Sequence, residues 1–472
     1  MRRVSITAFK QLVMTVRTVG QAARFAGVLA CAAVALPLPA HAAATPEEAA
    51  ALGSKLTAVG AERAGNAAGS IPPYTGGLPA SPAGQRPGES QPVDPFAGEK
   101  PLRVLTGSTI GDAAPMLTAG TRELLQRYPG FRIDIYSTHR SVGYPEHLAA
   151  NTRRNAIETR MTGDGQGLEN LRAGVPFPIP KDGSEVMWNH RLRYLGRTLS
   201  MHADSWFVSQ SGERTLTGSA RVFEEYPAYG TKSDAVLQEA DTWRRWKGQF
   251  SGPARRAGEN SLMVDSINPL RPGRRLWAYI PGQRRVKLAE YPDDALNTGS
   301  SGVYTNGDYF VLSGALDRFD LKLLGKREML VPYNTHRLSQ HPKVEDILNP
   351  GHINPDLLRW ELHRVWVVEA TLKPGQRHLY SKRFFYIDED SWTALASDGY
   401  DADGKLSRSV FGFLHYDPDA GAPVSTTHAA YDFGTGNYFL SFYTGSHGGV
   451  RHIEPLPSSQ WSTEALAGAG VR

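Results

Sequence analysis

The chain has 472 residues, of which 40% are hydrophobic, and it carries 52 Lys and Arg against 47 Asp and Glu. Its length and hydrophobic share predict a mostly globular chain with one large domain or two ordinary ones. The single cysteine, Cys31, excludes intramolecular disulfides and also excludes metal sites that need several thiolates.

The N-terminal segment has the features of a cleavable secretory signal peptide. Residues 1–24 hold five basic and no acidic residues, and an apolar run follows over residues 25–38. Small residues that end in Ala42 then form an A-x-A cleavage pattern. We therefore predict a signal peptide over residues 1–42, cleavage after Ala42 and a periplasmic mature protein. Cys31 lies within the apolar run, which leaves open whether it is ever lipidated.

Removal of the signal peptide changes the charge of the chain. The remainder holds 47 basic and 47 acidic residues and no cysteine. A formally neutral chain offers no general electrostatic attraction for nucleic acid or for anionic lipid. We therefore predict no nucleic-acid partner.

Residues 43–185 are predicted to be an N-terminal helical and Pro/Gly-rich extended region that packs on the following domain. Helical patterns begin at Thr45-Pro46 and recur over residues 116–128 and 145–160. The segment 65–101 is rich in Gly, Pro and Ser, which predicts extended chain.

Residues 186–445 are predicted to form a β domain, followed by a C-terminal tail at 446–472. Short aromatic and β-branched runs alternate there with turn signals every 8 to 14 residues. Consecutive strands joined by short loops pair antiparallel. The expected fold class is mainly β (α+β), with an antiparallel meander that curls into a barrel or part-barrel.

One predicted strand, 362–372, shows clear alternation. Trp366 and Val368 fall on an apolar face, while Glu361 and His363 fall on the other face. This pattern predicts one buried and one solvated face.

Side chains that could carry chemistry are scattered along the chain. The histidines His336, His341, His352 and His363 lack a helical metal-binding spacing, so we predict no metal and no cofactor. No serine lies in a nucleophile elbow, and we assign no catalytic residue. A pair of carboxylates could still serve a hydrolase, the candidates being Asp317, Asp320, Asp388 and Asp390.

Five stretches carry a resemblance to a known family. They are 174–180 (GVPFPIP), 277–286 (WAYIPGQRRV), 350–354 (PGHIN), 360–370 (WELHRVWVVEA) and 386–390 (YIDED). The chain resembles the uncharacterised proteobacterial family called "outer membrane lipoprotein-sorting protein", over about residues 45–445. That family is similar in fold to the periplasmic lipoprotein carriers LolA and LolB.

The resemblance implies a particular version of the meander. It implies an unclosed, LolA-like half-barrel with helices over its concave face and an apolar cavity for acyl chains. This chain is much larger than a simple carrier, and residues 45–185 have no counterpart there. The family has no agreed catalytic residues, so none is carried over.

Three functions remain open from the sequence. The leading hypothesis is a non-enzymatic periplasmic lipid- or lipoprotein-binding carrier of the Gram-negative envelope that acts at or near the outer membrane. Its partners would be an acyl-chain ligand or lipoprotein, and an outer-membrane barrel or envelope transporter. The alternatives are a structural adaptor that docks to an outer-membrane barrel or export complex, and a periplasmic hydrolase with paired carboxylates. From alternation alone, the predicted lipid-binding residues are Trp277, Tyr279, Trp366 and Val368.

Overall fold

The computed structural model describes residues 44–79, 93–230, 234–418 and 420–469. The predicted signal peptide and its cleavage site lie outside the described residues. In the part of the chain that is described, no helix is both long and apolar enough to cross a membrane.

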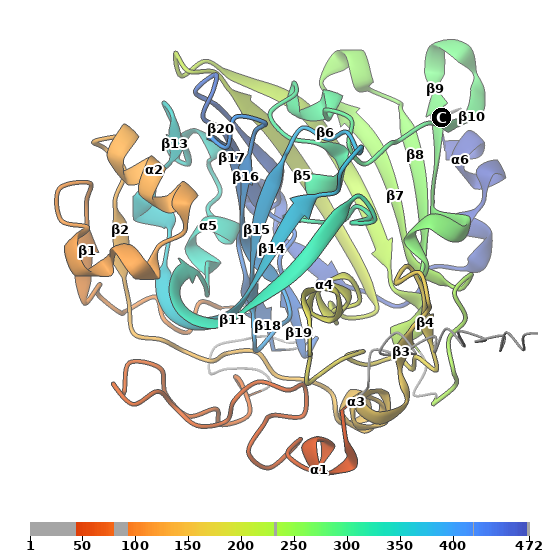
Figure 1. Ribbon diagram of the computed structural model, residues 1–472. Helices are drawn as coiled ribbons and strands as arrows, with labels where there is room; N and C mark the ends of the chain where they lie inside the picture. Colours follow the sequence, from red (N-terminus) through yellow and green to blue (C-terminus); the bar gives the residue numbers. More distant parts are fainter. Residues whose placement is uncertain (1–43, 80–92, 231–233, 419, 470–472) are drawn as a thin grey trace, which may run out of the picture. The chain divides into compact units, whose positions relative to one another are not determined.

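One sixteen-stranded sheet organises the described chain, and it is antiparallel apart from a single pairing between β2 and β14 (Figure 1). Its path runs β1-β2-β14-β15-β16-β17-β20-β21-β5-β6-β7-β8-β9-β10, with β11 added on β14 and β22 on β5. The strands are β1 (Arg103–Leu105), β2 (Ile133–Ile135), β5 (Thr198–Val208), β6 (Arg214–Glu225), β7 (Thr242–Gly252), β8 (Asn260–Ser266), β9 (Arg274–Ile280), β10 (Arg285–Ala289), β11 (Phe319–Pro332), β14 (Trp360–Leu372), β15 (Lys382–Asp388), β16 (Ala394–Tyr400), β17 (Leu406–Gly412), β20 (His428–Asp432), β21 (Asn437–Tyr443) and β22 (Val450–His452).

The remaining elements are short. Three two-stranded sheets pair β3 (Arg160–Met161) with β4 (Leu168–Glu169), β12 (Leu348–Asn349) with β13 (His352–Ile353), and β18 (His415–Asp417) with β19 (Ala422–Val424). The α-helices are α1 (Pro46–Ala49), α2 (Ala119–Arg127), α3 (Glu146–Glu158), α4 (Gly183–Arg191), α5 (His336–Gln340) and α6 (Thr463–Ala469).

The predicted antiparallel meander is confirmed, but it is built from two runs. The strands β5 to β10 form one run, and β14 to β17 with β20 and β21 form the other. They join where β21 pairs with β5, so strands far apart in sequence are neighbours. The two ends of the path, β1 and β10, do not pair with each other, and the sheet is therefore unclosed.

Both faces of the sheet are covered. We call the face that bears Val368 and Ala220 the inner face, and the strand registers carry it continuously from β14 to β9. Helix α4 packs on this face against β11 and β14, and Figure 1 shows it nearly end-on next to β11. The opposite, outer face is covered by α2 on β16 and β17 and by α6 on β8 to β10.

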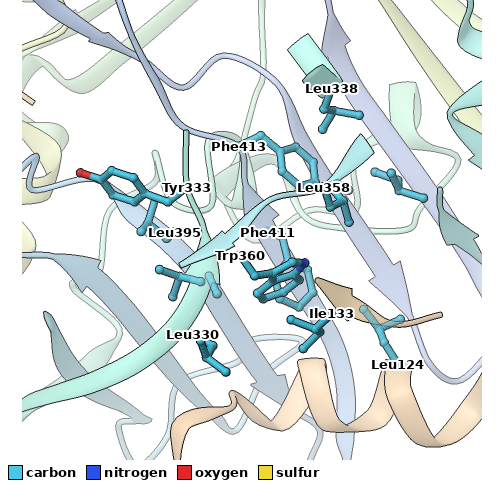
Figure 2. Packing of buried hydrophobic residues seen from close by; sticks show 14 of the residues in the cluster. Leu124, Ile133, Leu330, Tyr333, Leu338, Leu358, Trp360, Leu395, Phe411 and Phe413 are labelled. Atoms are coloured by element: carbon cyan, nitrogen blue, oxygen red, sulfur yellow. The ribbon is translucent and has the colours of Figure 1, made fainter. Parts of the chain in front are cut away.

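The largest hydrophobic cluster lies on the outer face of β14 to β21. Figure 2 shows Trp360 and Phe411 from the sheet close to Leu124 of α2 and Ile133 of β2. One expectation is corrected here, because Glu361 and His363, which share the outer face of β14 with Val365 and Val367 of this cluster, are fully buried rather than solvated. The N-terminal region covers this face of β14, and alternation within a single strand does not predict such a contact.

The N-terminal region is anchored on the hairpin that joins β15 to β16. Trp392 donates its indole N–H to the carbonyl of Val59 at 3.0 Å. Arg140, 7% exposed, donates from Nε and Nη2 to the two Asp390 carboxylate oxygens at 2.8 and 2.6 Å. At Gly60, where φ is +97°, a Cβ would lie 1.8 Å from the carbonyl oxygen of Pro178, so only glycine fits there.

Candidate functional site: an apolar cavity beside an arginine-lined cavity

An apolar cavity of about 220 Å³ lies on the inner face of strands β5 to β9. Its floor is made by alternate residues of these strands, which all point to the same side of the sheet. They are Ala203 of β5, Ala220 and Val222 of β6, Trp246 of β7, Met263 of β8 and Leu276 of β9. Ala203 and Ala220 sit opposite each other in the register, and their small side chains leave room above the middle of the floor.

The connection between β10 and β11, residues 290–318, covers this cavity. Tyr304 and Tyr309 of the connection line it, and their rings lie 5.5 and 5.0 Å from the rings of Phe439 and Phe442. Burial raises the pKa of both tyrosines, so each hydroxyl stays protonated. The connection therefore contributes aromatic surface and neutral hydroxyl groups to the cavity.

Asp308 fixes the connection to the sheet. Its carboxylate is fully buried, accepts a hydrogen bond from the Tyr380 hydroxyl at 2.8 Å and forms an ion pair with Arg383. Phe310 and Val311, two and three residues after Asp308, have positive φ values of 55° and 71°, which are unusual for bulky and β-branched side chains. Such backbone persists only where the surrounding structure holds it, and here both side chains are buried.

A second cavity of about 250 Å³ lies beside the first, between α4, strands β7 to β9 and the connection 290–318. Four guanidinium groups line it, those of Arg191, Arg193, Arg244 and Arg274. Arg274 and Ser313 line both cavities, so the two spaces share a wall. One space is apolar and the other is rich in cations.

The four arginines are not equally neutralised. Arg244 pairs with Glu224, and Arg274 donates from Nε to Asp265 at 2.7 Å and pairs with Asp293 at 3.2 Å. Among the described residues, Arg191 and Arg193 have no carboxylate within ion-pair distance. Burial lowers the pKa of the Arg191 guanidinium to about 10, which still leaves it charged at neutral pH.

The four residues predicted from alternation do not share one face. Trp366 and Val368 lie on the inner face, where Trp366 stacks on Trp392 with ring centroids 6.2 Å apart. Trp277 and Tyr279 lie on the outer face of β9, where they pack with Leu466 of α6. None of the four lines either cavity, and a role for them in lipid binding stays a prediction.

Trp277→Ala tests that prediction directly. If Trp277 only packs beneath α6, the variant lowers the unfolding temperature. The uptake of a fluorescent fatty acid should then be unchanged, because Leu276 is the β9 side chain that lines the apolar cavity. Loss of uptake in a variant that remains folded would instead support the predicted binding role.

The four carboxylates considered for a hydrolase do not all lie at one place. Asp388 lies opposite Val365 on β14, whereas Asp320 lies opposite Thr371 near the other end of that strand. Asp388 and Asp390 are buried and line neither cavity, while Asp320 is exposed and lines the arginine-lined cavity. The geometry brings Asp388 and Asp390 together with His363 instead, with one ligand atom of each within 4.8 Å of the others.

Asp388 is a buried acid with a raised pKa. Its Oδ2 accepts hydrogen bonds from the Ser391 N–H and hydroxyl at 2.8 and 2.6 Å, whereas Oδ1 has no partner among the described residues. Burial, and then the charge of Asp390, raise the pKa of Asp388 to about 6.

Asp388→Asn is expected to remove a pH dependence of stability. The folded state keeps the Asp388 proton up to about pH 6, whereas an unfolded Asp loses it near pH 3.9. The stability of the native chain relative to the variant therefore falls as pH rises from 4 to 6, by at most about 3 kcal/mol, and is constant above pH 6. Urea unfolding of both proteins at several pH values measures the difference, and parallel curves would contradict the assignment.

A second set of possible metal ligands lies at the surface. His202 and Asp204 project from the same side of β5, and His447 approaches them, with its Nε2 3.0 Å from Asp204. The two imidazole rings stack at 4.0 Å, and His202 Nε2 is bonded to the Ser219 hydroxyl at 2.9 Å. These contacts involve His202 Nε2, His447 Nε2 and Asp204 Oδ2, whereas Asp204 Oδ1 is buried without a partner among the described residues.

Sequence reasoning missed the arginines and small residues that shape the two cavities. Arg191 is the last residue of a helix, α4, that the sequence analysis did not identify, and Arg193 lies two residues beyond it. The Asp182-x-x-Glu185 spacing before its apolar residues is a capping signal that could have revealed it, and the Asp182 carboxylate does accept from the Glu185 N–H at 3.0 Å. No comparable signal marks Ala203 and Ala220 as cavity residues.

Comparison with known proteins places the chain in a family. The uncharacterized protein PA3922 of Pseudomonas aeruginosa is 39% identical over 385 residues, which cover 80% of this chain and 83% of that protein. A Vibrio parahaemolyticus domain named for outer membrane lipoprotein sorting is 15% identical, with a TM-score of 0.40, over 60% of this chain and 97% of its own. The LolA superfamily protein NE2245 of Nitrosomonas europaea is 13% identical, with a TM-score of 0.35, over 61% of this chain and 100% of its own.

The family resemblance described from the sequence is confirmed by a family model and by the relative that is 39% identical. The model of one family, the proteins of unknown function called DUF1329, matches residues 104–467. That range takes in the inner face of the sheet, the connection 290–318 and all four cavity arginines. The chain therefore belongs to the DUF1329 family.

Proposed function

We propose that this protein is a non-enzymatic periplasmic carrier that binds the acyl chain of a lipid or lipoprotein at or near the outer membrane. The observation that carries the proposal is the apolar cavity on the inner face of β5 to β9, covered by the connection 290–318. Ligand sites are concave and mostly apolar, with a few polar groups that orient the ligand. The signal-peptide pattern of residues 1–42 supports the compartment.

The mechanism is sequestration of an acyl chain from water. Each buried methylene contributes about 0.8 kcal/mol, so the chain is held by contacts that have no direction or sequence specificity. Release then needs a membrane or a partner that binds the same chain somewhat better. The outer-membrane barrel or envelope transporter predicted from the sequence would be such a partner.

The contacts of the N-terminal region favour a carrier over an adaptor. In the adaptor hypothesis, the protein fills the groove with its own N-terminal segment. Residues 44–79 instead pack on the hairpin between β15 and β16, and none of them lines either cavity. Residues 44–79 therefore leave the apolar cavity free for a ligand.

Native mass spectrometry of the mature protein purified from the periplasm, followed by lipid extraction, tests the proposal. A stoichiometric phospholipid, fatty acid or lipoprotein fragment is the expected result, and it would identify the cargo. An apo mass together with no uptake of a fluorescent fatty acid would overturn the carrier function.

A further inference from the structure

Buried hydrogen-bond donors without partners gather where the two cavities meet. Among the described residues, no acceptor is bonded to Nε of Arg191, Nε of Arg193, Nη2 of Arg244, the Tyr309 hydroxyl or the Ser313 hydroxyl. Buried polar groups are nearly always hydrogen-bonded, and each unsatisfied group costs free energy. Five unsatisfied donors around one space indicate that an acceptor belongs there.

The four arginines of this space outnumber the three carboxylates that pair with them by one charge. Arg244 and Arg274 are neutralised by Glu224, Asp265 and Asp293, as described above. Arg191 and Arg193 add two guanidinium groups that form no ion pair with a carboxylate among the described residues, and Arg193 is only 6% exposed. Its Nη1 donates to the carbonyl of His190 at 2.8 Å, which holds the side chain in place while leaving Nε without a bond.

The cationic space adjoins the apolar cavity directly. Arg274 and Ser313 line both, and the Arg244 guanidinium lies 5.4 Å from the ring of Tyr309, which lines the apolar side. A ligand that fills the apolar cavity and extends past Arg274 and Ser313 would enter the space lined by Arg191 and Arg193. The mature sequence is neutral as a whole, so this excess of positive charge is a local feature.

We propose that the arginine-lined cavity binds the anionic head group, a carboxylate or a phosphate, of an amphiphile whose acyl chain occupies the apolar cavity. The inference rests on the proposed carrier function and deepens it by naming the ligand class. Guanidinium groups match the geometry of carboxylate and phosphate oxygens, and their charge-assisted hydrogen bonds are about twice as strong as neutral ones.

The arrangement selects against uncharged amphiphiles. A long-chain alcohol of equal length buries the same methylenes but neutralises neither Arg191 nor Arg193 and leaves most of the five donors unpaired. A site built to hydrogen-bond a ligand rejects an analogue that lacks the acceptor. We expect dodecanoate to bind at least about tenfold more tightly than dodecanol.

The inference is tested by measuring the binding of five compounds to the mature protein, with displacement of a fluorescent fatty acid as the readout. The compounds are dodecanoate, dodecanol, dodecyl phosphate, acetate and inorganic phosphate. The variant Arg193→Met should weaken dodecanoate and dodecyl phosphate at least about tenfold and change dodecanol less than about twofold. Arg191→Met is a second variant at a less buried position. Arg275→Met, an exposed arginine on β9 that lines neither cavity, is the matched control and should change none of the affinities.

The outcomes separate the inference from the function on which it rests. Equal binding of acid and alcohol, unchanged in both variants, would overturn the head-group site and leave the carrier function standing. Binding of acetate or inorganic phosphate as tight as that of the amphiphiles would show an anion site that does not depend on a chain, which also overturns the inference. Failure of every long-chain probe to bind would overturn both.

Discussion

Ala220→Phe should abolish most acyl binding while leaving the protein folded. Ala220 lies in the floor of the apolar cavity, on the inner face of β6, and an added ring would occupy the space above it. If the ring displaces three methylenes of a bound chain, binding weakens by about 2.4 kcal/mol, which is about 50-fold. Titration with a fluorescent fatty acid measures the change.

The matched control is Arg221→Phe. It introduces the same side chain one residue further along β6, where the exposed Arg221 points to the outer face. Acyl binding should be unchanged in this variant, and both variants should show the circular dichroism of the native protein. Equal binding by Ala220→Phe and the native chain would exclude the cavity on β5 to β9 as the acyl site.

Arg140→Met should cost about 3–5 kcal/mol of the free energy of unfolding. Arg140 forms a buried two-bond pair with Asp390 and lies 3.4 Å from Glu389. Removal of the guanidinium leaves a buried carboxylate that no other described basic side chain pairs, since Lys326 and Arg364 reach Glu389 and not Asp390. Urea unfolding of the mature protein measures the loss.

Arg103→Met is the control for this prediction. Arg103 and Asp112 form an ion pair of similar length, 2.7 Å, but both side chains are exposed. Exposed pairs contribute little because water screens them and their side chains lose freedom. Similar stability of the two variants would mean that the Arg140–Asp390 pair does not anchor the N-terminal region.

The sequence by itself determined the class of the fold. The strand 362–372 was predicted from alternation, and β14 has nearly those bounds. The two predicted helices at 116–128 and 145–160 correspond to α2 and α3. Strand period, short loops and cap residues act over a few positions of the chain, so one sequence is sufficient to read them.

Only the tertiary structure decided which strand face became a cavity. Alternation separates Leu276 from Trp277, but it does not say which of them meets a ligand and which meets a helix. That choice depends on β21 pairing with β5, on α6 covering the outer face, and on the connection 290–318 crossing the inner face.

The arginine-lined cavity was likewise decided only by the tertiary structure. Its four arginines come from helix α4, the residues just after it, and strands β7 and β9, and the first and last of them are 83 positions apart. Only the packing of these elements places the four side chains around one space, those of Arg191, Arg193, Arg244 and Arg274. From the sequence alone we expected a formally neutral, exported protein with an antiparallel β fold. The folded chain decided where its unpaired charge is concentrated, because desolvation and ion pairing depend on neighbours in space and not in sequence.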